Sequence, residues 1–277
     1  NFSVRLAEVD RSVSGKGLQV FGTVTKSIVA TGADLVGYSG FSASNYLQQP
    51  YNSGLDFGTG DFCYIWWANI PTSSFQAHFT REHHNGTTFI GSSFEVFSDN
   101  GSGKLKIFMS DDGYVSYDAW TTTVSISGMQ CFAVVRRGGV IDTYVDGAFD
   151  NTHTISAPAG SMSNTSAKLS VGMQANLSSP NTSGSIALLR ASATAPSAEQ
   201  IAKIYNDEKV LFQAGAQATL YGSSDAVTAL AHDDATDLLH VGTSAGRSVF
   251  QGLRRVENTT DAITAAISAS NGLVAEE

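Results

Sequence analysis

Two stretches of the sequence hold residue types that hydrolases use. Glu8 and Asp10 form a Glu-x-Asp pair, but no third acid follows at residues 12 or 13. A glycoside hydrolase needs two carboxylates across the scissile bond, about 5–5.5 Å apart for a retaining mechanism. Residues 242–246 fit the pattern G-x-S-x-G, which requires a following helix and a downstream Asp and His. Here the next residues alternate as in a strand and no histidine follows His240, so we predict no catalytic residue and no enzyme activity.

Other residues raise the question of a metal site. His83 and His84 are adjacent, but the spacing His-Glu-x-x-His is absent. Neighbouring residues on a strand point to opposite faces, so the two histidines are not expected to share an ion. Loop oxygens of Asp99, Asp111 and Asp112 could ligate calcium, although aspartate is equally a turn-forming residue. We predict no metal and no cofactor, and calcium is an alternative that nothing else in the sequence supports.

A group of aromatic and acidic residues between positions 111 and 120 indicates a ligand. Aromatic faces can stack on the apolar faces of sugar rings, and carboxylates can accept hydrogen bonds from sugar hydroxyls. We therefore predict a glycan-binding site formed by Tyr114, Tyr117, Trp120, Asp111 and Asp118. The alternative is ordinary packing of these aromatic residues in a sheet. Trp66 and Trp67 are assigned to the core because their neighbours are apolar.

Short strands joined by turns must position these residues. Strands are expected at residues 18–24, 62–68, 93–97, 104–109, 115–120, 131–136, 140–145, 168–173 and 185–191. Asn-Gly and Asp-Gly pairs between them predict hairpins, because these residues tolerate a positive φ. Repeated hairpins at this spacing predict an antiparallel sandwich. A capping-box pattern at residues 197–200 predicts one helix over residues 197–209, with Ser197 as its N-cap.

Bulk composition excludes several partners. A chain of 277 residues is long enough for one large sandwich and a smaller appendage. Its net charge of -9 and the lack of a basic stripe argue against nucleic acid. The longest apolar run, residues 64–70, is far shorter than the ~20 residues of a membrane-spanning helix. No signal peptide is visible, and because the sequence begins at Asn1 rather than Met we expect a further segment upstream.

The two cysteines, Cys63 and Cys131, both fall in strand-like runs. Two cysteines do not make a disulfide framework, so we expect buried free thiols. A disulfide between neighbouring strands is the alternative.

Several phrases, taken in order over residues 8–210, resemble the concanavalin A-like, laminin G-like sandwich family. They are residues 10–15, 22–24, 42–47, 57–62 followed by 66–67, 133–138 with 144–147, 189–190, 197–199 and 204–205. The resemblance implies a mainly β, antiparallel jelly-roll sandwich over residues 1–214, with one short helix. Members of the family mostly bind glycans or proteins. Hydrolases with this fold commonly carry E-x-D-x-(x)-E on one strand, which this sequence lacks.

After Gly215 the sequence changes character. Residues 226–250 resemble one blade of a β-propeller, which predicts a small C-terminal β unit over residues 215–277. One blade cannot bury both of its faces, so we expect a homo-oligomer, most simply a trimer, joined through this unit. The alternative is that the unit folds back on its own sandwich. Residues 262–274 are expected to form one further strand or an extended tail.

A sandwich followed by the phrase at residues 239–253 resembles phage virion proteins, especially tail or head fibres. That resemblance implies a non-catalytic module on the virion surface, which binds a host-surface glycan or a neighbouring virion protein and so serves host recognition and adhesion. Two alternatives remain open: a purely structural virion protein without a ligand, and a polysaccharide depolymerase.

Overall fold

The computed structural model describes residues 17–71, 75–99, 101–156, 160–176, 183–216, 227–252 and 255–260, and the backbone alone of residues 7–8, 254, 267–270 and 273–276. The chain forms two compact units. A sandwich unit comprises residues 1–27 and 37–205, and a C-terminal unit comprises residues 28–36 and 206–277. The fold is mainly β with one short α-helix, as the sequence predicted.

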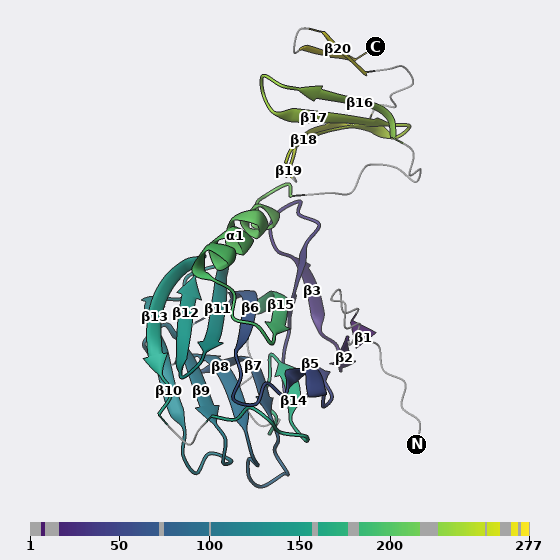
Figure 1. Ribbon diagram of the computed structural model, residues 1–277. Helices are drawn as coiled ribbons and strands as arrows, with labels where there is room; N and C mark the ends of the chain where they lie inside the picture. The colour runs from purple at the N-terminus through teal and green to yellow at the C-terminus, as the bar shows by residue number, and fades with distance from the viewer. Residues whose placement is uncertain are drawn as a thin grey trace. The chain divides into compact units, whose positions relative to one another are not determined.

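The first large sheet has eight antiparallel strands (Figure 1). In spatial order they are β1 (Ala7–Glu8), β2 (Leu18–Phe21), β5 (Tyr46–Gln49), β14 (Lys168–Val171), β7 (Gln76–Glu82), β8 (Ser93–Ser98), β9 (Lys104–Ser110) and β10 (Asp118–Ser125). Strands β7 to β10 follow one another along the chain through hairpins. The strand predicted at residues 115–120 is corrected here, because a turn occupies residues 111–116 and β10 begins only at Asp118.

The second sheet has seven strands. In spatial order they are β13 (Ala148–Thr154), β12 (Val140–Val145), β11 (Gln130–Arg137), β6 (Phe62–Asn69), β15 (Ser185–Ser192), β4 (Val36–Ser39) and β3 (Thr25–Ile28). Two short 3-10 helices lie outside the sheets: η1 (Ser53–Leu55) belongs to the sandwich unit and η2 (Lys209–Phe212) to the C-terminal unit. The Asp-Gly turn predicted at residues 146–147 is confirmed between β12 and β13.

The C-terminal unit contains a four-stranded antiparallel meander and a separate two-stranded hairpin. The meander is formed by β16 (Val227–Asp233), β17 (Leu238–Thr243), β18 (Gly246–Gln251) and β19 (Arg254–Thr259), and the hairpin by β20 (Ile267–Ser270) and β21 (Leu273–Glu276). Residues 242–246 therefore lie in a β-hairpin rather than at a strand-to-helix elbow. The single strand or tail expected at residues 262–274 is corrected to this hairpin, while residues 261–266 and 271–272 lie outside the described ones.

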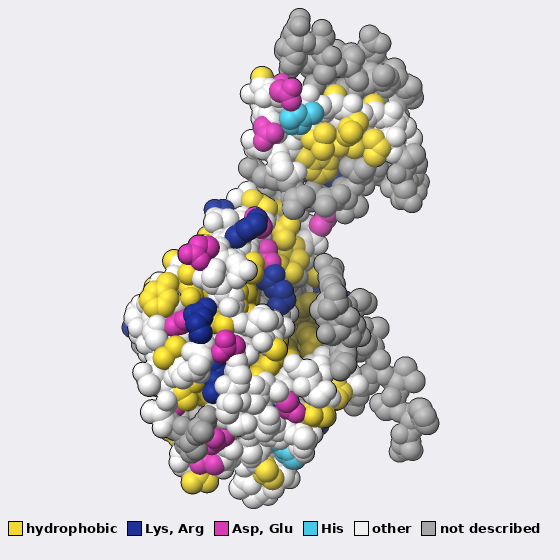
Figure 2. All heavy atoms as spheres, viewed as in Figure 1, with side chains coloured by type: hydrophobic (Ala, Val, Ile, Leu, Met, Phe, Trp, Pro, Cys, Tyr) yellow, Lys and Arg dark blue, Asp and Glu magenta, His cyan; other side chains and the backbone are white. Residues whose placement is uncertain are grey.

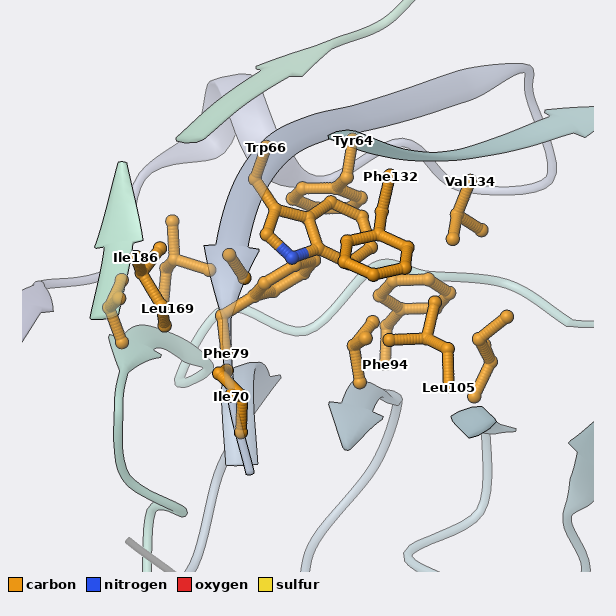
Figure 3. Packing of buried hydrophobic residues seen from close by; sticks show 14 of the residues in the cluster. Tyr64, Trp66, Ile70, Phe79, Phe94, Leu105, Phe132, Val134, Leu169 and Ile186 are labelled. Atoms are coloured by element: carbon orange, nitrogen blue, oxygen red, sulfur yellow. The ribbon is translucent and has the colours of Figure 1, made fainter. Parts of the chain in front are cut away.

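The core of the sandwich unit lies between its two large sheets (Figure 3). Alternate residues of β6, among them Tyr64 and Trp66, point inward and meet Phe79 of β7 and Phe94 of β8. All four side chains are almost fully buried. Burying a side chain of this size stabilises the fold by about 1.5–3 kcal/mol. The prediction that Trp66 belongs to the core is confirmed.

Helix α1 (Ala198–Glu208) begins with the predicted capping box. The Gln200 N–H donates to Ser197 Oγ at 3.3 Å, and the Ser197 N–H donates back to Gln200 Oε1 at 2.8 Å. Tyr205 of this helix stacks on Trp67 with ring centres 5.7 Å apart. Trp67 is thus buried, as predicted, but on the face of the second sheet away from the core cluster.

Cys63 and Cys131 are both buried and free, which confirms the expectation of free thiols. The register pairs Cys63 of β6 with Val135 of β11, and Cys131 of β11 with Trp67 of β6. The two thiols therefore lie on neighbouring strands but four positions apart, too far for a disulfide. Among the helices that the structure describes, none is long and apolar enough to cross a membrane.

Candidate functional site

The candidate site lies on the outer face of the eight-stranded sheet. Side chains alternate along a strand, and Phe94 and Val96 of β8 point into the core. Glu95 and Phe97 therefore point to the outer face. Phe97 is only 1% exposed although it is not part of the core cluster. Other side chains must therefore cover the outer face at this point.

Those side chains are aromatic and form a continuous row. We define the aromatic band as Phe75, Phe97, Phe108, Tyr117, Tyr114 and Phe89. Successive ring centres in this order lie 4.4, 5.8, 5.9, 5.7 and 5.1 Å apart. The Lys106 ammonium lies 5.3 Å from the ring centre of Phe108. Tyr117 is 53% exposed, so the band offers an aromatic face to solvent.

A tight loop between β9 and β10 carries the two tyrosines of the band. The Tyr114 N–H donates to Ser110 Oγ at 3.1 Å, and the Ser116 N–H donates to the Asp112 carboxylate at 3.0 and 3.1 Å. These bonds replace the strand pairing predicted for residues 115–117 and hold Tyr114 at a φ of 68°. The Ser116 N–H in particular lowers the pKa of Asp112. A non-glycine residue with such a φ is strained by about 1 kcal/mol or more.

The neighbouring loop fixes this one in place. The Gly113 N–H donates to the Gly91 carbonyl oxygen at 3.0 Å. Gly113 has a φ of 77°, and a Cβ at this position would lie 2.6 Å from the Phe89 carbonyl oxygen. Only glycine fits this close approach, so the two loops are held together by backbone contact.

The three aromatic residues predicted for glycan binding do not lie on one face of the sheet. Tyr114 and Tyr117 belong to the aromatic band. Trp120 pairs with Ile107, packs against the core and stacks on His153 at 5.9 Å between ring centres. Trp120 therefore faces the interior of the sandwich, away from the two tyrosines.

The two predicted aspartates are engaged with the segment that follows β13. Asp111 accepts a hydrogen bond from the Gly160 N–H at 3.1 Å. Asp118 accepts from the Ser156 N–H at 2.8 Å and from its hydroxyl at 2.7 Å. Contact of any of these residues with a ligand stays a prediction.

Sequence reasoning missed a pair of glutamates beneath the band. Glu82 of β7 and Glu95 of β8 are both buried on the outer face. Glu82 Oε1 accepts from the Ala175 N–H at 2.6 Å, and Glu95 Oε2 accepts from Gln174 Nε2 at 3.2 Å. The other oxygen of each carboxyl is buried, and so is the hydroxyl of Tyr114. Glu95 lies within hydrogen-bonding reach of both Glu82 and Tyr114.

The two carboxyl groups influence each other strongly. Burial and the adjacent Glu82 carboxyl raise the pKa of Glu95 well above its usual value. Burial and the nearby Glu95 likewise raise the pKa of Tyr114. Two carboxyls within hydrogen-bonding reach in a buried site cannot both be ionised without a large free-energy cost, which favours the protonated form of Glu95. The signal in the sequence was the strand alternation, which places Glu95 at an outward position between the inward-facing Phe94 and Val96.

The site offers no arrangement for a bound metal. In the part of the chain that the structure describes, no group of three or more His, Cys, Asp or Glu side chains is placed to hold an ion. His84 Nδ1 accepts from the Gly86 N–H at 3.2 Å, and its ring contacts Phe89. The histidine pair therefore belongs to the loop that supports the aromatic band.

The two stacked antiparallel sheets, with a helix on one outer face and a polar and aromatic surface on the other, define a concanavalin A-like β-sandwich. The chain belongs to the concanavalin A-like lectin/glucanases superfamily, whose laminin G-like family model matches residues 41–202. A comparison with curated protein sequences finds no match.

Solved structures share this fold at low sequence identity. Domain 4 of an extracellular arabinanase from Geobacillus stearothermophilus, in complex with arabinotriose, has a TM-score of 0.51 and 15% identity, with 66% of this chain and 82% of that chain covered. The botulinum neurotoxin serotype G binding domain has a TM-score of 0.56 and 10% identity, with 87% and 58% covered. The serotype D ligand-binding domain in complex with N-acetylneuraminic acid has a TM-score of 0.53 and 12% identity, with 89% and 61% covered. The chain thus spans about six tenths of each of these two toxin chains.

Proposed function

We propose that this protein is a non-catalytic glycan-binding module and that its binding surface is the aromatic band. The observation that carries the proposal is the row of aromatic rings on the outer face, with Tyr117 exposed in its middle. Aromatic faces supply large contact area at low entropic cost and suit the apolar faces of sugars. The superfamily includes lectins, and two of the similar structures were solved with a saccharide bound.

The arrangement of acids argues against hydrolysis. A retaining glycosidase holds its two carboxyls about 5–5.5 Å apart, and an inverting one holds them further apart. Glu82 and Glu95 are within hydrogen-bonding reach of each other and are buried. Residue 10 and the side chain of Glu8 lie outside the described residues. The polysaccharide depolymerase considered from the sequence therefore gains no support from Glu82 and Glu95.

A substitution on the band tests the proposal. Tyr117→Ala is expected to weaken binding of a glycan by about tenfold or more, because an exposed aromatic anchor at the centre of an interface contributes over 1 kcal/mol. The glycan is first identified on a printed array that includes arabinotriose and N-acetylneuraminic acid, and affinity is then measured by calorimetry. The matched control is Phe149→Ala, which removes an aromatic residue of similar exposure from β13 of the other sheet. Equal affinity of Tyr117→Ala and the unaltered protein would remove the band from the proposal.

The biological setting that we propose is a virion. The support is the resemblance of residues 239–253 to phage fibre proteins, together with a fold suited to binding at a surface. In that setting the module lies on the particle surface and contacts a host glycan or a neighbouring virion protein. The second candidate is a structural virion protein without a ligand, and an array without any hit would favour it.

We propose that the C-terminal unit joins copies of the chain into a homo-oligomer, most simply a trimer. Its meander is one four-stranded sheet, and Val227, Leu230 and Val256 are 48%, 63% and 40% exposed. On the face seen in Figure 2, hydrophobic side chains of this unit gather in one patch beside a histidine and acidic side chains. Exposed apolar side chains of this kind are commonly buried against symmetry mates in fibres.

Light scattering on the full chain at micromolar concentration is expected to give a mass of about three chains, following the closed symmetry common in such assemblies. Leu230→Glu and a chain that ends at Gly215 are both expected to be monomeric. A monomeric full chain contradicts the proposal, as does an oligomer that persists in the shortened chain. The monomeric result would favour the alternative in which the unit folds back on its own sandwich.

A further inference from the structure

The buried glutamate pair lies directly under the loop that carries the proposed glycan surface. Glu95 is 2% exposed and Glu82 is 0% exposed. Ser93 Oγ and the Tyr114 hydroxyl are buried in the same place as one oxygen of each carboxyl. Glu95 lies within hydrogen-bonding reach of Glu82 and Tyr114, and Tyr114 lies within reach of Ser93. Two carboxyls and two hydroxyls therefore share one buried site, and the loss of a proton from that site changes their hydrogen bonds.

Surrounding charges do not neutralise the pair. None of the ion pairs found among the described residues involves Glu82 or Glu95. On β14, Lys168 lies opposite Glu82 in the register, and its side chain is exposed. On β9, Lys104 and Lys106 share the outer face, and Lys106 pairs with Asp99 at 3.6 Å.

The loops around the pair contribute no cation either. Asp111 and Asp112 are held by hydrogen bonds within their own surroundings. His83 directly follows Glu82 and belongs to the opposite face by strand alternation. His84 supports the Gly86 turn. From β8 and from the segment after β14, the groups that face the pair are Ser93, Gln174 and the Ala175 N–H, all uncharged.

We propose that Glu82 and Glu95 form a proton-operated latch for the loop of residues 111–117. With Glu95 protonated, Tyr114 closes over the pair. When that proton leaves to the solvent, two adjacent carboxylates must be hydrated, and water reaches them only if Tyr114 moves away. Opening also releases the left-handed backbone of Tyr114. Because Tyr114 and Tyr117 belong to the aromatic band, the latch would regulate glycan binding, and this consequence rests on the function proposed above.

Hydrogen exchange on the full chain tests the latch without any glycan. Between the ordinary Glu range and the raised pKa of Glu95 in the closed state, the opening constant of the amides at residues 113–117, corrected for intrinsic exchange, is expected to rise about tenfold per pH unit, because one proton is released per opening. Amides of the core strand β11 exchange only on global unfolding and serve as the reference for that larger step, so residues 113–117 should open at a much lower free energy than β11 at every pH. In Glu95→Gln the rise should vanish, since a neutral amide removes the second charge.

Glu82→Gln should behave in the same way, and it replaces Glu95→Gln if that variant does not fold. The matched control is Glu199→Gln, an exposed glutamate at the start of α1, which should retain the full pH dependence. Exchange that is independent of pH in the unaltered protein, or a rise that persists in both latch variants, would overturn the latch. Full protection at pH 8 restored by 5 mM Ca2+ and lost with EDTA would also overturn it, because a cation rather than a proton would then occupy the pair. An array without glycan hits would leave these exchange results unaffected.

Discussion

Replacing Asp56 with alanine is expected to lower the free energy of unfolding of the sandwich by about 3–5 kcal/mol, because it leaves a buried guanidinium without its counter-charge. The Arg81 side chain is 2% exposed and pairs with the Asp56 carboxylate, whose side chain is 14% exposed. The same carboxylate accepts hydrogen bonds from the Tyr51 hydroxyl at 2.7 Å and from the Asn164 N–H at 3.0 Å. One substitution therefore removes the anchor of three separate segments.

Urea denaturation at pH 7 measures this loss. The matched control is Asp99→Ala, which breaks a partly exposed pair with Lys106 at 3.6 Å and should cost about 1 kcal/mol or less. Asp56→Asn keeps the shape and one acceptor oxygen and should lie between the two. Equal losses in Asp56→Ala and Asp99→Ala would show that the Arg81 charge is solvated in the folded protein.

The acid dependence of this pair has a definite sign. Burial alone would raise the pKa of Asp56, but the hydrogen bonds from Asn164 and Tyr51 and the charge of Arg81 bring it below the usual value. A carboxyl whose pKa is lowered by folding stabilises the fold above the ordinary Asp range. That contribution is lost as the pH falls through the pKa in the folded state.

Elements with a strong local signal could be predicted from the sequence. The hairpins follow from Asp-Gly pairs, and the helix start follows from the reciprocal bonds of Ser197 and Gln200. In each case the residues that determine the element are close together in the chain, so a short sequence pattern is enough to predict it.

Strand β7 was missed for the opposite reason. It contains His78, Arg81 and Glu82, which resemble a solvated segment, yet all of them are buried. Their partners lie far away in the sequence: Trp66 for His78, Asp56 for Arg81, and the Ala175 N–H for Glu82. Burial of polar side chains by such distant partners leaves no local pattern.

The sequence predicted only part of the candidate site, because it did not show which side chains of the strand face outward. The sequence placed Trp120 beside Tyr117, but the turn formed by Ser110 and Asp112 shortens the strand. The register then sets Trp120 opposite Ile107 on the core side. Phe75, Phe89 and Phe108 reach the band from other strands and loops, and only the sheet order brings them together.

Two buried groups make stability depend on pH in opposite directions. The raised pKa of Glu95 means that the folded state binds a proton that the unfolded chain has released, so its contribution falls as the pH rises above the ordinary Glu range. His78 acts on the acid side. Its Nδ1 accepts a hydrogen bond from Trp66 Nε1 at 3.0 Å in the core, and burial lowers the pKa of its imidazole from 6.5 to about 3.

Between the ordinary histidine pKa of 6.5 and the value of about 3 in the fold, the unfolded chain takes up a proton on His78 that the folded protein does not bind. The free energy of unfolding should therefore fall by about 1.4 kcal/mol per pH unit as the pH is lowered through this interval, in addition to the effect of the carboxylates.

His78→Asn should remove that part of the slope, because Asn Oδ1 can still accept from Trp66 Nε1 but does not titrate. His84→Asn is the matched control, since His84 also accepts through Nδ1 but lies in a loop, and it should keep the slope. Urea denaturation from pH 7 to 4 provides the comparison, and an identical slope in His78→Asn and the unaltered protein would show that the imidazole is already protonated in the fold.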